Sequence, residues 1–94
     1  MTAETYIPTE VSFAGRRIED VCAVTLHDAD SNDPHGSLTT QKPLREGERG
    51  GPLVMSGTRY GKVWQITLPE IEVIRRTPVG CEFIVYGRLT RSAL

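Results

Sequence analysis

The segment HDADSNDPHG, residues 27–36, gathers carboxylate, amide and imidazole groups, which are the usual protein ligands of metal ions. An EF-hand calcium loop places oxygen ligands at positions 1, 3 and 5, and Asp28, Asp30 and Asn32 match that spacing. The pattern also needs Gly at position 6 and Glu at position 12, where this chain has Asp and Thr. A looser Ca²⁺ site is therefore a secondary hypothesis, and a solvated polar turn is the preferred interpretation.

Zinc binding and hydrolytic catalysis have less support. A zinc site would combine His27 and His35 with Asp28 or Asp30, and the spacing fixes no third strong ligand. Cys22 lies five residues before His27, but Asp28 would point to the opposite face of a strand and could not orient the imidazole. The chain has no G-x-S-x-G elbow, P-loop or H-E-x-x-H motif. We therefore expect no metal, no cofactor and no enzymatic activity.

Single-stranded nucleic acid is the alternative ligand, because small β-barrels bind it with exposed aromatic and basic side chains. The candidate residues for this function are Arg75, Arg76, Tyr86, Arg88 and Arg91. Trp64 shares a strand face with Ile66 and Leu68, so we expect it in the core and not in a stacking platform. The net charge of −1 argues against binding duplex nucleic acid over the whole surface.

The charge is divided unevenly along the chain. Residues 1–47 have four basic and eight acidic side chains, a net −4, whereas residues 48–94 have seven basic and four acidic ones, a net +3. Opposite charges on two halves would suit docking on a charged partner or head-to-tail self-association. A protein partner is the preferred prediction, with self-association as an alternative.

The elements that must position these residues are mainly strands, because the dominant hydrophobic period is two. Residues 62–68 alternate apolar and polar side chains, and the parity reverses after Pro69, which predicts a bulge or bend there. Residues 75–80 are typical of a hairpin turn, and residues 81–89 predict a central strand. We expect the last residues, 90–94, to fray.

The N-terminal half is less regular. Residues 1–8 are expected to form an arm, and EVSFAG predicts a strand that ends in a turn at Ala14-Gly15. Residues 16–26 fit either a β-branched buried strand, which we prefer, or a short helix. Residues 27–52 contain only two large apolar side chains, Leu38 and Leu44, and are predicted to form one long polar loop.

Together these patterns predict a mainly β single domain, residues 1–94, folded as a small antiparallel barrel or sandwich of about five or six strands. Its function is predicted to be non-enzymatic binding of a partner protein through the long loop, since loops on rigid sheets carry recognition. The expected contact residues are Asp28, Asp30, Asp33, His35, Arg45, Glu48 and Arg49. Deleting residues 38–50 is then expected to leave the fold nearly intact.

Compartment and origin are inferred from weaker features. The start MTAETYIPTE has neither the basic nor the apolar region of a secretory signal, and no apolar run could span a bilayer, so we expect a cytoplasmic protein without membrane contact. Cys22 and Cys81 lack metal-site spacing and are predicted to be buried thiols. The segment EVSFAGRRIEDV is similar in style to strand-turn-strand segments of phage virion β-domains, which suggests a phage or mobile-element accessory protein acting in a virion or on a host system. No family follows from this resemblance.

Overall fold

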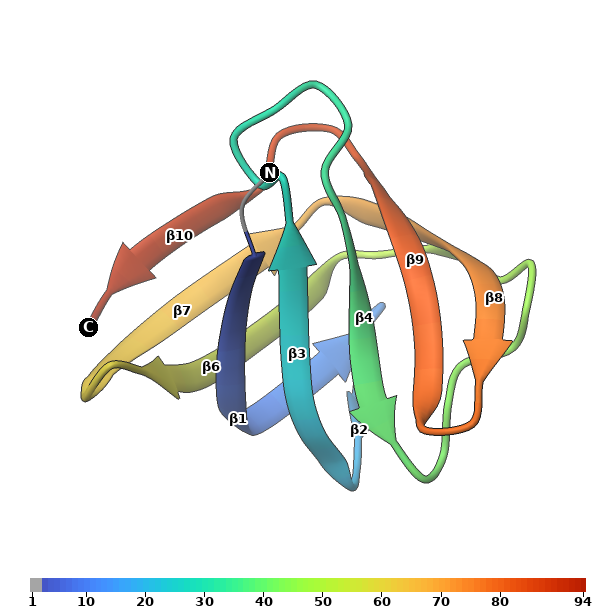
Figure 1. Ribbon diagram of the computed structural model, residues 1–94, viewed down its shortest axis with the longest axis horizontal. Coiled ribbons are helices and arrows are strands. Elements are labelled where there is room, and N and C mark those ends of the chain that lie inside the picture. The colour runs from blue at the N-terminus through green and yellow to red at the C-terminus, as the bar shows by residue number, and fades with distance from the viewer. Residues whose placement is uncertain (1–2) are drawn as a thin grey trace.

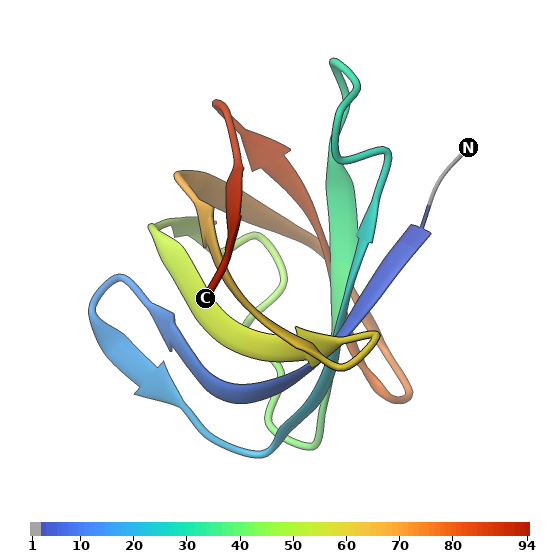
Figure 2. The same ribbon diagram turned by 90° about the vertical axis from the view of Figure 1, so that its left-hand side faces the viewer.

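The computed structural model describes residues 3–94, which form one antiparallel β-sheet that curls into a half-barrel (Figure 1, Figure 2). No residue of this range is helical, and the structure there has no helix that could cross a membrane. The strands are β1 (Ala3–Phe13), β2 (Arg16–Ile18), β3 (Val21–His27), β4 (His35–Thr40), β5 (Arg49–Gly50), β6 (Leu53–Arg59), β7 (Lys62–Leu68), β8 (Glu70–Thr77), β9 (Gly80–Tyr86) and β10 (Thr90–Ala93).

The sheet order is β10-β7-β6-β1-β3-β4-β9-β8-β5, with β2 paired to β1. The long strand β1 connects the two halves of the sheet. Its first residues pair with β3 from Ala3↔His27, and its later residues pair with β6 up to Phe13↔Leu53. A register shift between Pro8 and Glu10 marks the bend between these two partners.

The predicted corner at Pro69 is confirmed. Before it, Ile66 and Leu68 of β7 face the interior, and after it Ile71 and Val73 of β8 do so, as the reversed parity requires. Proline cannot donate to a ladder, so the chain passes there from one set of neighbouring strands to another. The chain makes a second corner between β5 and β6, where Gly51 approaches the Pro69 carbonyl so closely that a Cβ would lie 2.5 Å from its oxygen.

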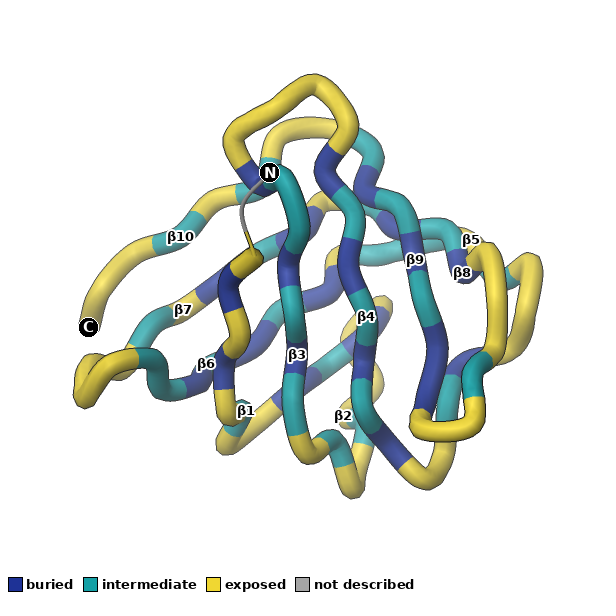
Figure 3. Tube along the Cα trace, in the orientation of Figure 1, coloured by how far each residue is buried: buried dark blue, intermediate teal, exposed yellow. Residues whose placement is uncertain are grey.

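The core fills the interior of the curl. Along β3, β4 and β9, buried positions alternate with half-buried or exposed ones (Figure 3). The side chains that are almost completely buried are Tyr6, Val11, Val24, Leu26, Leu38, Leu53, Ile66, Leu68, Ile71, Val73, Cys81 and Phe83. Trp64 is partly buried and packs against this cluster.

The predicted count of five or six strands is wrong, because residues 3–94 form ten. Two of the additional strands arise at the corners, which divide residues 49–59 and 62–77 into two strands each. The helical alternative for residues 16–26 is also wrong, since β2 and β3 occupy this segment with a turn between them. Within residues 3–94, both ends of the chain are paired in the sheet. β1 begins within the expected arm at Ala3, and β10 pairs with β7 where fraying was expected.

The single long loop over residues 27–52 is the largest error. It contains β4, which lies between β3 and β9, and the short strand β5. The hydrophobic pattern of the sequence does not indicate β4, because its inward residues are Gly36, Leu38 and Thr40, and only Leu38 is large and apolar. A Cβ at Gly36 would lie 2.3 Å from the Thr25 carbonyl oxygen and 3.0 Å from the Phe83 ring, so both neighbouring strands approach this glycine closely. A deletion of residues 38–50 would remove buried Leu38, the second half of β4 and the strand β5, so it would disturb the fold and not leave it intact.

The two cysteines differ. Cys81 is fully buried as predicted, and burial raises the pKa of its thiol. Cys22 is exposed, contrary to prediction. A register shift between Val21 and Ala23 turns Cys22 outward, although it has the same sequence parity as the buried Val24.

Candidate partner-binding cleft

The metal-ligand-rich segment forms the turn between β3 and β4, and its polar groups largely hydrogen-bond to one another. The Ser31 hydroxyl donates to the Asp28 carbonyl at 2.7 Å and accepts the Asp33 backbone N–H at 3.1 Å. His35 Nδ1 lies 3.0 Å from the Asp33 carbonyl. Within residues 3–94, no three His, Cys, Asp or Glu side chains are arranged to hold a metal ion. The turn is therefore stabilised by its own backbone and side-chain contacts.

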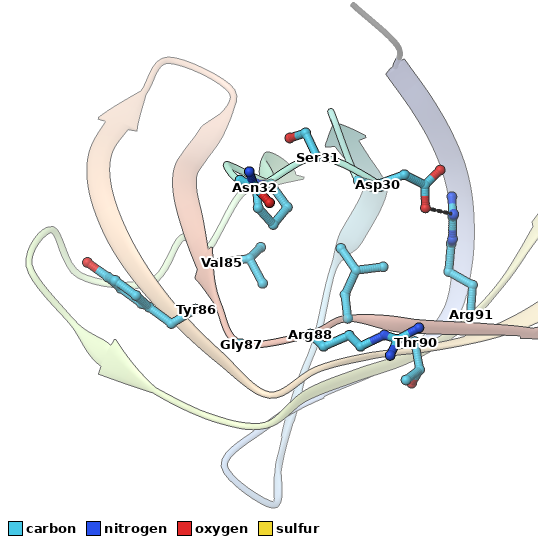
Figure 4. A pocket seen from close by; sticks show the side chains of 12 residues that line it. Asp30, Ser31, Asn32, Val85, Tyr86, Gly87, Arg88, Thr90 and Arg91 are labelled. Carbon is cyan, nitrogen blue, oxygen red and sulfur yellow. Dashed lines mark hydrogen bonds and ion pairs between the residues drawn. The ribbon is translucent and has the colours of Figure 1, made fainter.

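A cleft of about 900 Å³ lies between this turn and the segment that leads from β9 into β10 (Figure 4). The turn supplies one wall and residues 85–91 supply the other. The lining residues are Ala29, Asp30, Ser31, Asn32, Pro34, Val85, Tyr86, Gly87, Arg88, Leu89, Thr90 and Arg91. The structure thus brings together residues from the two candidate sets that the sequence separates by more than fifty positions.

The walls of the cleft differ in polarity. Ala29, Pro34 and Val85 are buried and Leu89 is half-buried, so they form an apolar floor. Ser31, Asn32, Arg88 and Thr90 are exposed and form a polar rim. This combination of an apolar floor and a few polar groups is typical of recognition sites.

One end of the cleft is closed by a group that we call the Arg91 clasp, which consists of Glu4, Tyr6, Asp30 and Arg91. The Arg91 guanidinium donates to Glu4 and to Asp30, the latter at 2.6 Å (Figure 4). The Tyr6 hydroxyl donates to Glu4 at 2.7 Å. The clasp therefore joins β1, the β3–β4 turn and β10.

The electrostatics of the clasp favour an ionised Glu4. Burial raises the pKa of the Glu4 carboxyl, but hydrogen bonds from Arg91 and Tyr6 outweigh burial, so its pKa lies below the ordinary 4.5. The pKa of Tyr6 is raised, mainly by burial and to a smaller extent by the hydrogen bond to Glu4. The hydrogen bond to Glu4 is also the main reason why the pKa of Arg91 is raised. Glu4 and Arg91 are therefore both charged over the neutral range, and Tyr6 donates its hydrogen bond as a neutral phenol.

We expect Glu4 to contribute to acid sensitivity. Because its pKa is lower in the folded state, its ionised form stabilises the fold above about pH 4.5, and this contribution is lost as the pH falls through the folded pKa. The free energy of unfolding of a Glu4→Gln variant should therefore decrease less than that of the wild type between about pH 5 and pH 3. Urea titrations at several pH values measure this difference. Parallel pH profiles for the two proteins would contradict it.

Tyr86 lies at the opposite end of the cleft from Arg91 (Figure 4). Its hydroxyl donates to Glu72 at 2.7 Å, and this hydrogen bond is the main reason why the pKa of Tyr86 is raised. The Arg49 guanidinium lies 3.9 Å from the centre of the Tyr86 ring and also pairs with Glu70. Tyr86 is therefore held by neighbouring side chains.

Arg88 differs from the other charged residues of the cleft. It is exposed and makes no hydrogen bond or ion pair with any residue of 3–94, whereas Arg91 is shared between the carboxylates of Glu4 and Asp30. It follows Gly87, which adopts a left-handed conformation with φ +85° at the end of β9. The rim therefore presents one cation without an acidic partner.

The predicted partner-binding residues do not form one surface. Asp28, Asp30 and Asp33 lie in the β3–β4 turn, while His35 lies on β4 and stacks on His27 with ring centres 5.2 Å apart. The others belong to the β4–β5 connection and β5. There Arg45 pairs with Glu48 at 4.0 Å, and the Glu48 carbonyl accepts the Val73 N–H of β8. Of the predicted set, only Asp30 lines the cleft directly.

The predicted nucleic-acid residues are also separated. Arg75 and Arg76 pair with the beginning of β9, whereas Tyr86 is the last residue of β9 and is followed by Arg88 and Arg91. Arg75 binds both carboxylate oxygens of Glu82 at 2.7 Å, which is the main reason why its pKa is raised. Several of these charges are thus engaged within the protein.

Sequence reasoning missed Glu4, Ser31, Asn32, Leu89 and Thr90 as members of the cleft or its clasp. Glu4 and Tyr6 are two positions apart and therefore share a strand face, which was the available signal for their contact.

Comparisons with models of known protein families, with curated proteins and with solved structures found no match to this chain.

Proposed function

We propose that the protein is a non-enzymatic protein-interaction module, and that its cleft binds a partner segment carrying a carboxylate. The observation that carries this proposal is the unpaired Arg88 at the rim of an apolar floor. A carboxylate would form a bidentate ion pair with this guanidinium, while apolar side chains of the same segment would cover Val85 and Leu89.

Two further observations support a binding role. The cleft is bordered by the paired strand β10 and by a turn with internal hydrogen bonds, so it is formed before a ligand arrives. Its lining residues include no His, Cys or Lys, and the hydroxyl of Ser31 is engaged with a backbone carbonyl. The single-stranded nucleic-acid alternative has less support, because Arg75 and Arg91 are already paired with acids.

A displayed library of random peptides tests this proposal. We expect wild-type protein to enrich peptides in which an acidic residue is flanked by apolar ones. Arg88→Glu should weaken their binding at least tenfold, because a like charge then faces the peptide carboxylate. The matched control is Arg76→Glu, which makes the same charge change at an exposed, unpaired arginine near the other end of β9. Peptides that bind the Arg88→Glu variant as well as the wild type would contradict the proposal.

A further inference from the structure

A second surface feature lies on the outer face of the sheet, away from the cleft lining. Four of the six large apolar side chains that are exposed within residues 3–94 gather there. We call them the Tyr60 patch: Ile7 (56% exposed), Tyr60 (89%), Val63 (41%) and Leu94 (75%). The other two, Ile74 and Val79, belong to the β8–β9 hairpin.

Strand pairing explains why these side chains are close together. Ile7 of β1 lies opposite Thr58 of β6, and Thr58 lies opposite Val63 of β7. The Leu94 N–H donates to the Val63 carbonyl at 2.9 Å, which continues the same row beyond β10. Directly opposed residues point to the same face, and this is the outer one because the adjacent Tyr6 faces the core. The next outer row is polar, with Ser56, Gln65 and Ser92.

The backbone at Tyr60 indicates that its side chain has a role outside the fold. Tyr60 and Gly61 form the two-residue β6–β7 turn with φ +54° and +76°, the positive values that a type I′ turn requires. Asn, Asp or Gly is preferred at the first of these positions, because a larger side chain is strained at positive φ. The aromatic ring is almost fully exposed, so core packing does not compensate for that strain. A strained and exposed residue is a reason to infer function.

The charges beside the patch define the kind of partner. Arg59 and Lys62 lie opposite each other across the turn, and neither makes a hydrogen bond or an ion pair with a carboxylate in the part of the chain that the structure describes. The Arg59 guanidinium lies 4.7 Å from the Tyr60 ring centre and 5.7 Å from the Tyr6 ring centre, and its charge also lowers the pKa of Glu4. Arg59 therefore lies between the Tyr60 patch and the clasp. Glu10 lies one row further, opposite Ser56. A second copy docked symmetrically would bring two pairs of these cations to one interface, which disfavours self-association.

From these observations we propose that the Tyr60 patch is a second docking surface, which binds a partner protein through an apolar contact area bordered by Asp or Glu side chains. Tyr and Arg are the residue types that most often dominate the binding energy of interfaces. The partner's apolar area would cover Ile7 and Val63, and its acids would pair with Arg59 and Lys62. This surface is independent of Arg88, so either docking proposal can fail without the other.

The test is Tyr60→Asn, because Asn suits the turn and removes the ring. We expect its melting temperature to equal or exceed that of the wild type, while binding weakens at least tenfold. The matched control is Ala14→Asn in the β1–β2 turn, where Ala14 and Gly15 also have positive φ of 53° and 80°. This control should have the same conformational effect on its turn and leave binding unchanged.

Binding is measured by capture from a lysate of the source organism on immobilised wild-type and variant protein, and then with the purified captured protein. Support requires a protein that the wild type and Ala14→Asn retain, that Tyr60→Asn and Val63→Ser lose, and whose binding weakens as salt is raised. The proposal is overturned if no captured protein shows this dependence. It would also be overturned if vesicles containing phosphatidylserine showed the same dependence on Tyr60, or if the wild type self-associated and Tyr60→Asn did not.

Discussion

Replacing Arg91 with Met is expected to lower the free energy of unfolding by about 2–3 kcal/mol, a large part of the stability of a small domain. The substitution would leave the Glu4 carboxylate without its ion-pair partner, and the Glu4 side chain is only 11% exposed. A buried charge that loses its partner destabilises more than the intact pair stabilises. Chemical denaturation followed by tryptophan fluorescence measures the change, because Trp64 packs against the core.

Two further variants separate charge from packing in this experiment. Arg88→Met removes an exposed arginine without an ion pair three residues away, and should change stability by less than about 0.5 kcal/mol. Combining Arg91→Met with Glu4→Gln removes the unpaired charge and keeps an oxygen for the Tyr6 hydroxyl, so the double variant should lose less stability than Arg91→Met alone. Equal losses from Arg88→Met and Arg91→Met would show that the clasp does not stabilise the fold.

Gly80→Ala is expected to destabilise the fold by about 3 kcal/mol or more, in the upper range for overpacking. A Cβ at Gly80 would lie 1.8 Å from the Leu38 carbonyl oxygen and 3.1 Å from the Thr40 nitrogen, both backbone atoms of β4. Neither atom can move without disturbing the pairing of β4 with β9. The melting temperature and the denaturant midpoint should both decrease.

Gly47→Ala is the matched control for this steric effect. Gly47 has φ +85° and no atom within 4 Å of a Cβ, so an added methyl group meets only the conformational cost of about 1–2 kcal/mol. The difference between the two variants isolates the close approach of β9 to β4. If Gly80→Ala were no more destabilising than Gly47→Ala, the tight contact with Leu38 would be refuted.

The C-terminal half of the fold could be predicted because its signals are local. Alternation around Ile66 and Ile71 identifies the interior faces of β7 and β8, and Pro69 accounts for the change of parity between them. The turns at Ala14-Gly15 and before Gly80 were recognised from residue types that favour turns. In each case, the residues that determine the structure lie within a few positions of one another.

The features that could not be predicted depend on distant residues. β4 is a central strand although its inward Gly36 has no side chain, because Thr25 of β3 and Phe83 of β9 lie close beside that glycine, and no short window of the sequence contains all three residues. Gly80 was interpreted as turn punctuation, whereas its close neighbour is Leu38 on another strand. The cleft likewise unites Asp30 with Arg91, so neither candidate set alone indicated it.

The clasp also affects the order in which the fold can form during synthesis. Glu4 and Arg91 are 87 positions apart, so the carboxylate enters the fold long before its cationic partner has been made. Until then β1 would have to bury the Glu4 carboxylate without its ion pair, and its pairing with β3 would be less favourable. Pairings between such distant segments are formed slowly, in milliseconds to seconds for β proteins of this size. The Glu4–Arg91 pair therefore forms only after Arg91 has been made, and a nascent chain that stops before Arg91 would pair its first strand less stably.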